Sequence, residues 1–302
     1  MNWFWFSITA LLLWSGSDFF SKIGCRDKRD PYSHLKMVMA VGVVMGIHAA
    51  AEIAGGVEIT WAIIWAYLPV SILYILSMAM GYVGLRYIEL SVSSPICNAS
   101  GALVAVLSIC FGKAVMNHPL QYLAVAMACL GVIGLGVVEA TEDPTLRAER
   151  QKNSNYKYAK SWMAIAMPVA YCFLDAAGTF ADSLVLETIQ EDSANVAYEL
   201  TFLTAGAVCF IYTVIIKKQK LIPKMEIPKY VGATFETAGQ LAYIYALTDS
   251  EHVAMSAPII SSYCAVSVLW SRIFLKEKLS WKHYLAILSI VIGIVIMGVF
   301  DM

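Results

Sequence analysis

The stretch LQYLAVAMACLGVIGLGVV, residues 120–138, carries no charged side chain, and EATEDPTLRAERQKNSNYKYAK, residues 139–160, follows it with five Lys and Arg residues. An apolar helix of this length crosses the ~30 Å hydrocarbon core of a bilayer, and a basic loop after it is typical of the cytoplasmic side. The chain has 302 residues, of which 59% are hydrophobic and 14% charged, too apolar for a soluble domain of this size. The sequence therefore predicts an integral membrane protein.

The same alternation of apolar segment and polar loop recurs along the chain. Segments long enough to cross a bilayer predict ten transmembrane helices, so the expected fold class is an all-α polytopic membrane protein. The ten segments lie near residues 3–21, 36–54, 61–85, 92–111, 120–138, 162–181, 194–216, 229–247, 253–271 and 283–300.

Basic residues are distributed unevenly between the two sets of loops. Of the 21 Lys and Arg residues, 20 lie in or beside the gaps after the first, third, fifth, seventh and ninth segments, and Lys113 is the exception. Cytoplasmic loops hold the excess of Lys and Arg. We therefore expect these gaps in the cytoplasm, both termini on the non-cytoplasmic side, and the plasma membrane as the location. The lipid bilayer is an expected partner, and nucleic acid is not.

The second half of the sequence resembles the first. An aromatic residue and an acid stand four positions apart at 14–18 and again at 171–175, while Tyr82 and Pro95 recur as Tyr245 and Pro258 at a constant offset of 163. Because each half holds five segments, an odd number, the second half must cross the membrane upside down, as in the inverted repeats of many secondary transporters. We expect repeats at 1–140 and 161–302, joined by a cytoplasmic linker at 141–160.

These motifs resemble the drug/metabolite transporter superfamily, specifically its ten-span EamA type. The resemblance is carried by WSGS at 14–17, YIELSVSSP at 87–95, DSEHVAMSAP at 249–258 and LKEKLS at 275–280. Before the fifth segment the chain departs from the family pattern, with Gly112-Lys113 in place of Gly-Glu. The resemblance implies alternating access, a central cavity lined by segments 1–4 and 6–9, and peripheral segments 5 and 10.

Acidic residues enter the predicted segments, whereas no Lys or Arg lies deep in any of them. The acids are Asp18, Asp175, Glu199 and Glu236. An ionisable group at a helix centre costs at least ~2.5–3.5 kcal/mol, so it normally faces protein or a watery cavity and marks a pathway. An acidic interior attracts cations and disfavours phosphorylated substrates.

Asp175 and Glu236 are the strongest candidates for substrate binding. Tyr171 lies on the same helical face as Asp175, and Gln240 and Tyr243 lie on the face of Glu236. The structural alternative for Asp175 is a neutral carboxyl that is hydrogen-bonded to a neighbouring helix. The structural alternative for Glu236 is an interhelical hydrogen bond that only holds packed helices together.

The other two acids stand nearer the ends of their segments. Asp18 matches Asp175 in the repeat, but Lys22 one turn further on could form an exposed ion pair with it. Glu199 lies close to the outer end of its segment, which favours a solvated rim or gate residue. His48 and Glu52 are too few ligands for a metal site, and no metal is expected.

Aromatic and proline residues complete the predicted site. Trp14, Tyr74 and Tyr82 lie inside segments, where aromatic faces can hold organic ammonium groups at ~0.5–2 kcal/mol each, although core packing is the ordinary role of any one of them. Pro95 and Pro258 interrupt matching segments and could act as hinges, line the cavity, or be tolerated kinks.

The sequence thus predicts a secondary transporter of a small organic cation or amine-bearing metabolite that works by alternating access. Asp175 or Glu236 could also carry a proton, which would give antiport, and uniport is the alternative. An exporter of amino acids or other zwitterions and a non-transporting sensor or scaffold remain open. There is no phosphate-binding loop, Asp-rich run or HExxH motif, so no enzyme activity and no cofactor are expected. The protein would act as a monomer or homodimer.

Overall fold

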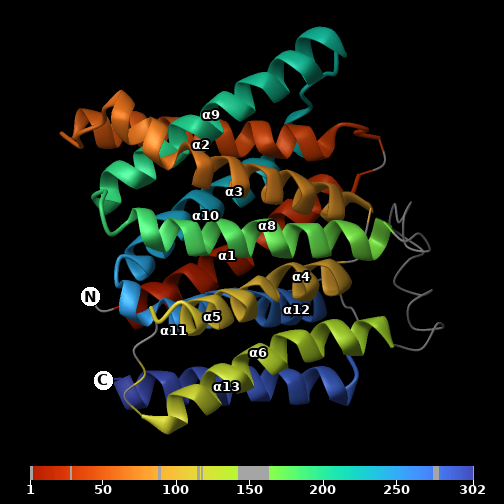
Figure 1. The fold of residues 1–302 in the computed structure, drawn as a ribbon. Helices are drawn as coiled ribbons and strands as arrows, with labels where there is room; N and C mark the ends of the chain where they lie inside the picture. Colours follow the sequence, from red (N-terminus) through yellow and green to blue (C-terminus); the bar gives the residue numbers. More distant parts are fainter. Residues whose placement is uncertain are drawn as a thin grey trace.

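The computed structural model describes residues 3–27, 29–87, 90–113, 116, 118–141, 163–274 and 279–301, and in these ranges the regular structure is helical (Figure 1). The helices lie roughly side by side in one elongated bundle. In chain order they are α1 Trp3–Cys25, α2 Ser33–Ala54, α3 Trp61–Tyr87, α4 Leu90–Asn98, α5 Ser100–Cys110, α6 Pro119–Ala140, α8 Met163–Val185, α9 Glu191–Phe210, η1 Ile211–Ile216, α10 Pro223–Leu247, η2 Ser250–His252, α11 Val253–Ser261, α12 Tyr263–Phe274 and α13 Trp281–Asp301.

These helices form ten span-like units, as the sequence predicts, because α4 continues into α5, α9 into η1 and α11 into α12. Seven units are long and apolar enough to cross a membrane by composition alone. The other three are α1, α8 and α10, the helices that carry Asp18, Asp175 and Glu236. Several ends differ from prediction: α1 continues to Cys25, α8 continues to Val185 and α10 begins at Pro223. Apart from Thr141, the predicted linker lies outside the described residues.

The units that contain Pro95 and Pro258 break at matching positions. The turn after α4 is Ala99, four residues beyond Pro95, and the turn after α11 is Ser262, four residues beyond Pro258. At the second break the Ser262 hydroxyl donates to the Pro258 carbonyl at 2.7 Å. The predicted interruptions are therefore present, and a hinge role for the prolines stays a prediction.

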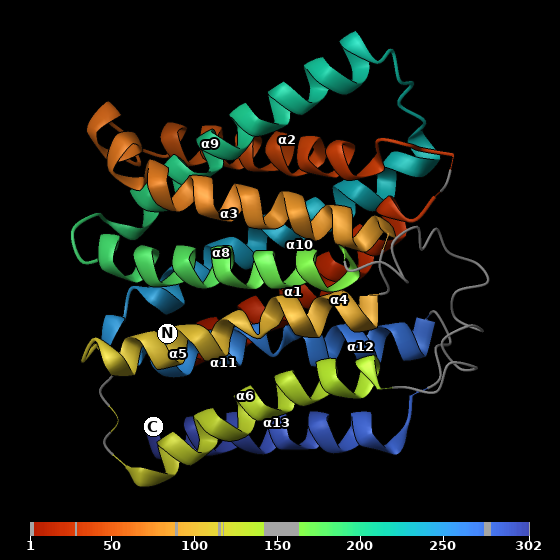
Figure 2. The same ribbon diagram turned by 45° about the vertical axis from the view of Figure 1, so that its right-hand side comes forward.

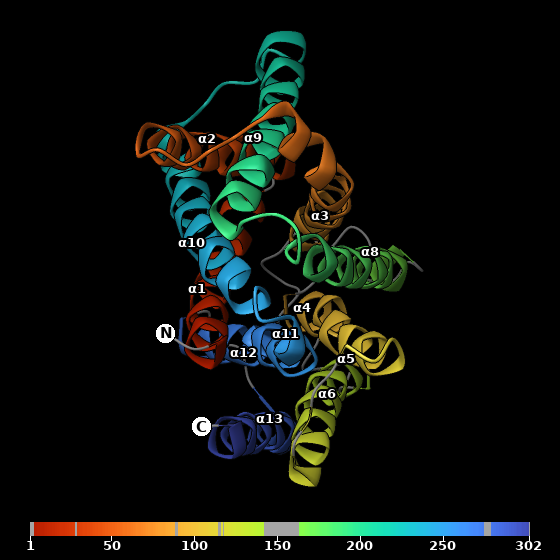
Figure 3. The same cartoon turned by 60° about the vertical axis from the view of Figure 1, so that its left-hand side comes forward.

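Helix packing relates the two halves of the chain. Helix α1 packs on α10, and its counterpart α8 packs on α3; α2 packs on α9, α5 on α11 and α6 on α13 (Figure 3). The α6 and α13 pair forms one edge of the bundle, as the family resemblance implies. Both termini lie at the same end of the bundle, which we call the terminal end (Figure 2). We call the opposite end the linker end; there α1 ends at Cys25 and α8 begins.

Candidate functional site

A cavity lies between the two halves of the bundle. Its described walls come from α1, α3, α4, α5, α8, α9, α10, α11 and α12, and none of its lining residues belongs to α2, α6 or α13. The structure brings together around this cavity all nine residues that the sequence predicts for substrate binding. They are Trp14, Asp18, Tyr74, Tyr82, Tyr171, Asp175, Glu236, Gln240 and Tyr243.

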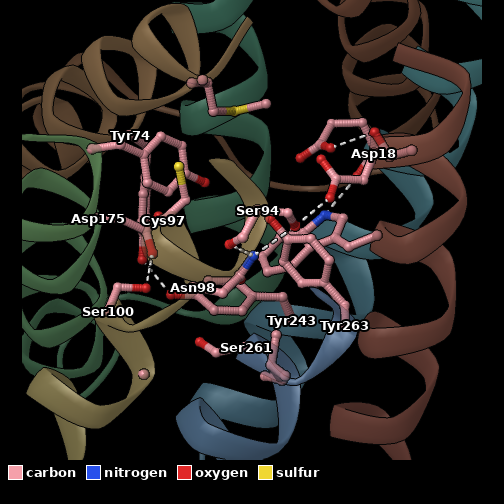
Figure 4. A pocket seen from close by; sticks show the side chains of 18 of the residues that line it. Asp18, Tyr74, Ser94, Cys97, Asn98, Ser100, Asp175, Tyr243, Ser261 and Tyr263 are labelled. Atoms are coloured by element: carbon pink, nitrogen blue, oxygen red, sulfur yellow. Dashed lines mark hydrogen bonds between the residues drawn. The ribbon is translucent and has the colours of Figure 1, made fainter. Parts of the chain in front are cut away.

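Three carboxylates face the cavity from three helices, and each accepts a hydrogen bond from a serine on another helix. Ser94 Oγ donates to Asp18 at 2.6 Å and Ser100 Oγ donates to Asp175 at 2.7 Å (Figure 4). Ser17 Oγ donates to Glu236 at 2.7 Å. Among the described lining residues there is no Lys, Arg or His, so the charged groups of the cavity wall are all acidic.

Aromatic rings form another part of the wall. The Trp14 ring lies against Tyr243, with centroids 5.0 Å apart, and meets the edge of Tyr263 at 6.0 Å. Tyr171 packs closely on α3, where a Cβ added to Gly81 would lie 3.0 Å from its ring. The Tyr74 and Tyr243 hydroxyls are hydrogen-bonded to each other. The sequence prediction did not assign Asn98 or the cavity-lining serines to the site, because Ser and Asn are also common as helix-packing residues. Tyr263 was left out because core packing is the ordinary role of a single aromatic residue.

Three buried donors in the cavity wall have no hydrogen-bond partner among the described residues. They are Gln240 Nε2 and the hydroxyls of Tyr82 and Ser21, which belong to residues only 3%, 5% and 1% exposed. Unsatisfied buried donors cost stability, and a bound ligand or water can satisfy them. All three donors belong to residues that line the cavity.

The sequence prediction assigns Lys36 and Lys229 to the basic loops, and the structure buries both side chains near the starts of their helices, at the linker end. Lys36 on α2 and Lys229 on α10 are buried and share the acids Asp30 and Glu226, with N–O distances of 3.0–3.5 Å. We call these four residues the linker-end ionic cluster. Arg86, also buried, donates to the Asp30 carbonyl. Interleaved acids and carbonyls offset the desolvation of these cations, which the sequence pattern alone does not reveal.

Of the two readings of Asp18, the exposed ion pair with Lys22 is contradicted by the burial of Lys22. Lys22 is buried, and its Nζ donates to the carbonyl of Leu85 at 2.8 Å. Leu85 lines the cavity, so this bond ties α1 to α3 beside the cavity wall. The long lysine side chain reaches a neighbouring helix rather than water.

Glu199 is not a solvated rim residue. Its side chain is fully buried, accepts from Asn195 at 3.2 Å and pairs with His48 Nδ1 at 2.9 Å. Glu199 does not line the cavity, and neither do Pro95 and Pro258. Glu199 is buried because α2 packs directly on α9 and supplies His48 as its partner.

A further buried acid, Asp182, lies one residue beyond the predicted end of its segment. It is fully buried and accepts from Tyr67 Oη at 2.7 Å. Its spacing from Tyr171 and Asp175 places it on their helical face, and this signal could have revealed it. The shorter predicted segment left it in a loop.

Comparison with known proteins agrees with this architecture. Residues 162–299 match the model of the EamA-like transporter family. One solved structure, described only as the crystal structure of a protein, aligns with 98% of this chain over 97% of its own length. The TM-score is 0.66 and the sequence identity is 15%, so the likeness shows the fold alone. No curated protein matches the sequence. The resemblance stated from the motifs is thus confirmed over residues 162–299, which are similar to the EamA-like transporter family, part of the drug/metabolite transporter superfamily.

Proposed function

We propose that the protein is a secondary transporter that moves a small organic cation or amine-bearing metabolite through the cavity between its two halves. The observation that carries this proposal is the charge of the cavity wall: Asp18, Asp175 and Glu236 line it together with aromatic rings, and the described lining contains no base. A positive ligand would replace the water that otherwise solvates these carboxylates. Trp14, Tyr243 and Tyr263 would contact its alkyl or ammonium groups.

Alternating access fits the way in which the helices pair. Exchanging the two halves turns the α1–α10 contact into the α8–α3 contact and the α5–α11 contact into the α12–α4 contact. It leaves the α2–α9 and α6–α13 pairs as they are. This is the pairing expected of inverted repeats related by a two-fold axis in the membrane plane. Rocking of one half against the other would expose the cavity to each side in turn.

Proton antiport is part of the proposal, with uniport as its mechanistic alternative. A cation and a proton that compete for Asp175 or Glu236 would be exchanged across the membrane, since neutralising the carboxylate removes the attraction for the cation. The linker-end ionic cluster supports a closed state at that end, because it joins α2 and α10 through buried ion pairs.

A zwitterionic substrate such as an amino acid is the second candidate. The unpartnered Gln240 Nε2 and Tyr82 hydroxyl favour it, because they could donate to a carboxylate while an acid holds the ammonium group. A non-transporting sensor would use the same cavity to bind ligand without flux.

A thermal-shift screen of the purified protein tests the proposal. The ligands are monoamines, polyamines and quaternary ammonium compounds, compared with zwitterionic amino acids and with anionic metabolites, because a ligand that binds the native state raises its melting temperature. Stabilisation by cations that is lost in both Asp175→Asn and Glu236→Gln supports the cation site. Asp192→Asn is a matched control, since Asp192 also accepts from a tyrosine but lies at the start of α9, outside the cavity wall.

Each other outcome of the screen has a distinct meaning. Stabilisation by amino acids that requires Asp175 together with Gln240 or Tyr82 would identify the substrate as a zwitterion rather than a cation. Stabilisation by anions that survives both carboxylate changes would overturn the proposed site. Cation binding without flux in proteoliposomes would favour the sensor.

A further inference from the structure

Asp182 is a fully buried carboxylate on α8 that does not line the cavity but is connected to it by hydroxyl groups. Tyr67 Oη donates to one carboxylate oxygen at 2.7 Å, and Tyr74 Oη donates to the other at 3.3 Å. Tyr74 is bonded in turn to the Tyr243 hydroxyl, which is hydrogen-bonded to Thr179 Oγ1 at 3.0 Å. Tyr74, Tyr243 and Thr179 line the cavity. A continuous chain of hydroxyls therefore runs from Asp182 to the cavity wall.

The groups that face Asp182 are tyrosines from several helices rather than bases. They are Tyr67 and Tyr74 on α3 and Tyr243 on α10, with Tyr198 on α9 packed edge-on against Tyr74. Asp175 lies two turns away on α8 itself, and residues 90–110, which form α4 and α5 against α8, contain no Asp, Glu, His, Lys or Arg. Within the described residues, no basic nitrogen lies within 4.0 Å of the Asp182 carboxylate.

The hydroxyl chain satisfies Asp182 in both protonation states. When the carboxylate is ionised, Tyr67 and Tyr74 donate to its two oxygens. Because each hydroxyl has one proton, Tyr243 then donates to Tyr74, and Thr179 donates to Tyr243. When the carboxyl is protonated, its O–H can donate to the Tyr74 oxygen, Tyr74 then donates to Tyr243, and Tyr243 donates to Thr179 Oγ1. A structural carboxylate paired with a lysine offers no such reversal, as the linker-end ionic cluster illustrates.

From this arrangement we infer that Asp182 binds the coupling proton of transport at a site separate from the substrate carboxylates; the inference rests on the proposed function. The proton forms an O–H bond with one Asp182 oxygen, and when that bond breaks the proton passes along Tyr74 to the cavity. A cation held by Asp175 against Tyr243 repels a proton on Asp182 across this short chain, so each lowers the affinity of the other. Such reciprocal coupling exchanges cation for proton without direct competition for one carboxylate.

This inference differs in a testable way from competition at Asp175 or Glu236. Those two acids line the cavity and would contact the substrate, whereas Asp182 is separated from it by Tyr74 and Tyr243. Loss of Asp182 should therefore uncouple transport from the proton while cation binding persists. Loss of Asp175 should abolish cation binding itself.

Infrared difference spectroscopy of the purified protein, titrated with acid and base alone, tests the site without any substrate. The protonated-carboxyl band is followed from about pH 4 to about pH 9, which begins near the ordinary Asp value of about 3.9. We expect Asp182→Asn to remove the component of the band that arises from Asp182. Asp192→Asn should leave that component unchanged. Tyr67→Phe keeps the carboxyl but removes one donor to its ionised form, so the component should remain and titrate at higher pH.

A spectrum of Asp182→Asn identical to that of the unchanged protein throughout this range would overturn the inference, and so would an unchanged titration in Tyr67→Phe. These failures are separate from failure of the proposed function, because the thermal-shift screen does not depend on the infrared result. If cations stabilise the protein through Asp175 but the Asp182 component is absent, the cation site stands and the proton site falls. If the component is present and no cation binds, the proton site stands without the transport proposed for it.

Discussion

Asp18 and Asp175 face the same cavity from opposite halves of the chain, and both are held by the broken unit formed by α4 and α5. Ser94, before the break at Ala99, donates to Asp18 at 2.6 Å, and Ser100, after it, donates to Asp175 at 2.7 Å. The break therefore separates the two donors. Any change in the angle between α4 and α5 would alter the spacing of the two carboxylates, which gives the predicted proline hinge a direct consequence for ligand binding.

Close contact between α2 and α9 depends on Gly42. A Cβ added there would lie 2.8 Å from the Phe202 carbonyl oxygen and 2.9 Å from the Cα of Gly206, both backbone atoms that cannot move aside alone. We expect Gly42→Ala to lower stability by about 1–3 kcal/mol, the usual cost of overpacking. At Gly46 an added Cβ meets only the end of the Leu203 side chain. Gly46→Ala should therefore have the smaller effect on the melting temperature, and the reverse order would contradict this packing.

The linker-end ionic cluster should be essential for stability. Lys229 is fully buried and lies 3.1 Å from both Asp30 and Glu226, so its removal leaves buried acids with fewer partners. Lys229→Met should destabilise the protein by about 3–5 kcal/mol, the usual cost of breaking a buried ion pair. Lys224→Met, on the exposed side of the same helix, is the control and should change the melting temperature little. Equal effects of the two substitutions would show that the cluster contributes nothing specific.

The orientation in the membrane can be tested with thiol labelling of intact cells. Cys110 is exposed at the end of α5, at the terminal end of the bundle, which the distribution of Lys and Arg assigns to the outside (Figure 2). A membrane-impermeant maleimide should label it without permeabilisation. Lys220→Cys in a Cys110→Ser background places a thiol in the exposed loop at the linker end, and it should be labelled only after permeabilisation. The opposite pattern would reverse the orientation.

Sequence patterns predicted the helices and the cavity wall better than they predicted the partners of buried charges. The ten units and the nine cavity residues follow from apolar length and from acids and aromatics repeated in both halves. The burial of Lys36 and Lys229 was missed because each also pairs with an acid far away in the chain, Lys36 with Glu226 and Lys229 with Asp30. Burial of Glu199 likewise depends on His48 from another helix. Such pairings are tertiary, and a helix-by-helix pattern cannot display them.

Asp182 was missed for a different reason. Its carboxylate ends the apolar run of α8, and a hydropathy boundary therefore places it outside the membrane segment, although α8 continues to Val185. The tyrosines that surround it come from α3, more than one hundred residues earlier. Helical spacing from Asp175 was the available signal, because both acids fall on one face.

Transport by Asp175→Asn in proteoliposomes tests the central claim most directly. The substrate is the cation that most raises the melting temperature of the unchanged protein, and uptake is driven by an imposed pH gradient. Asp192→Asn serves as the matched control, and the melting temperature without ligand verifies that each variant is folded. The account predicts that Asp175→Asn abolishes uptake while Asp192→Asn retains it. Uptake that is unchanged in folded Asp175→Asn would contradict the assignment of the cavity as the cation pathway.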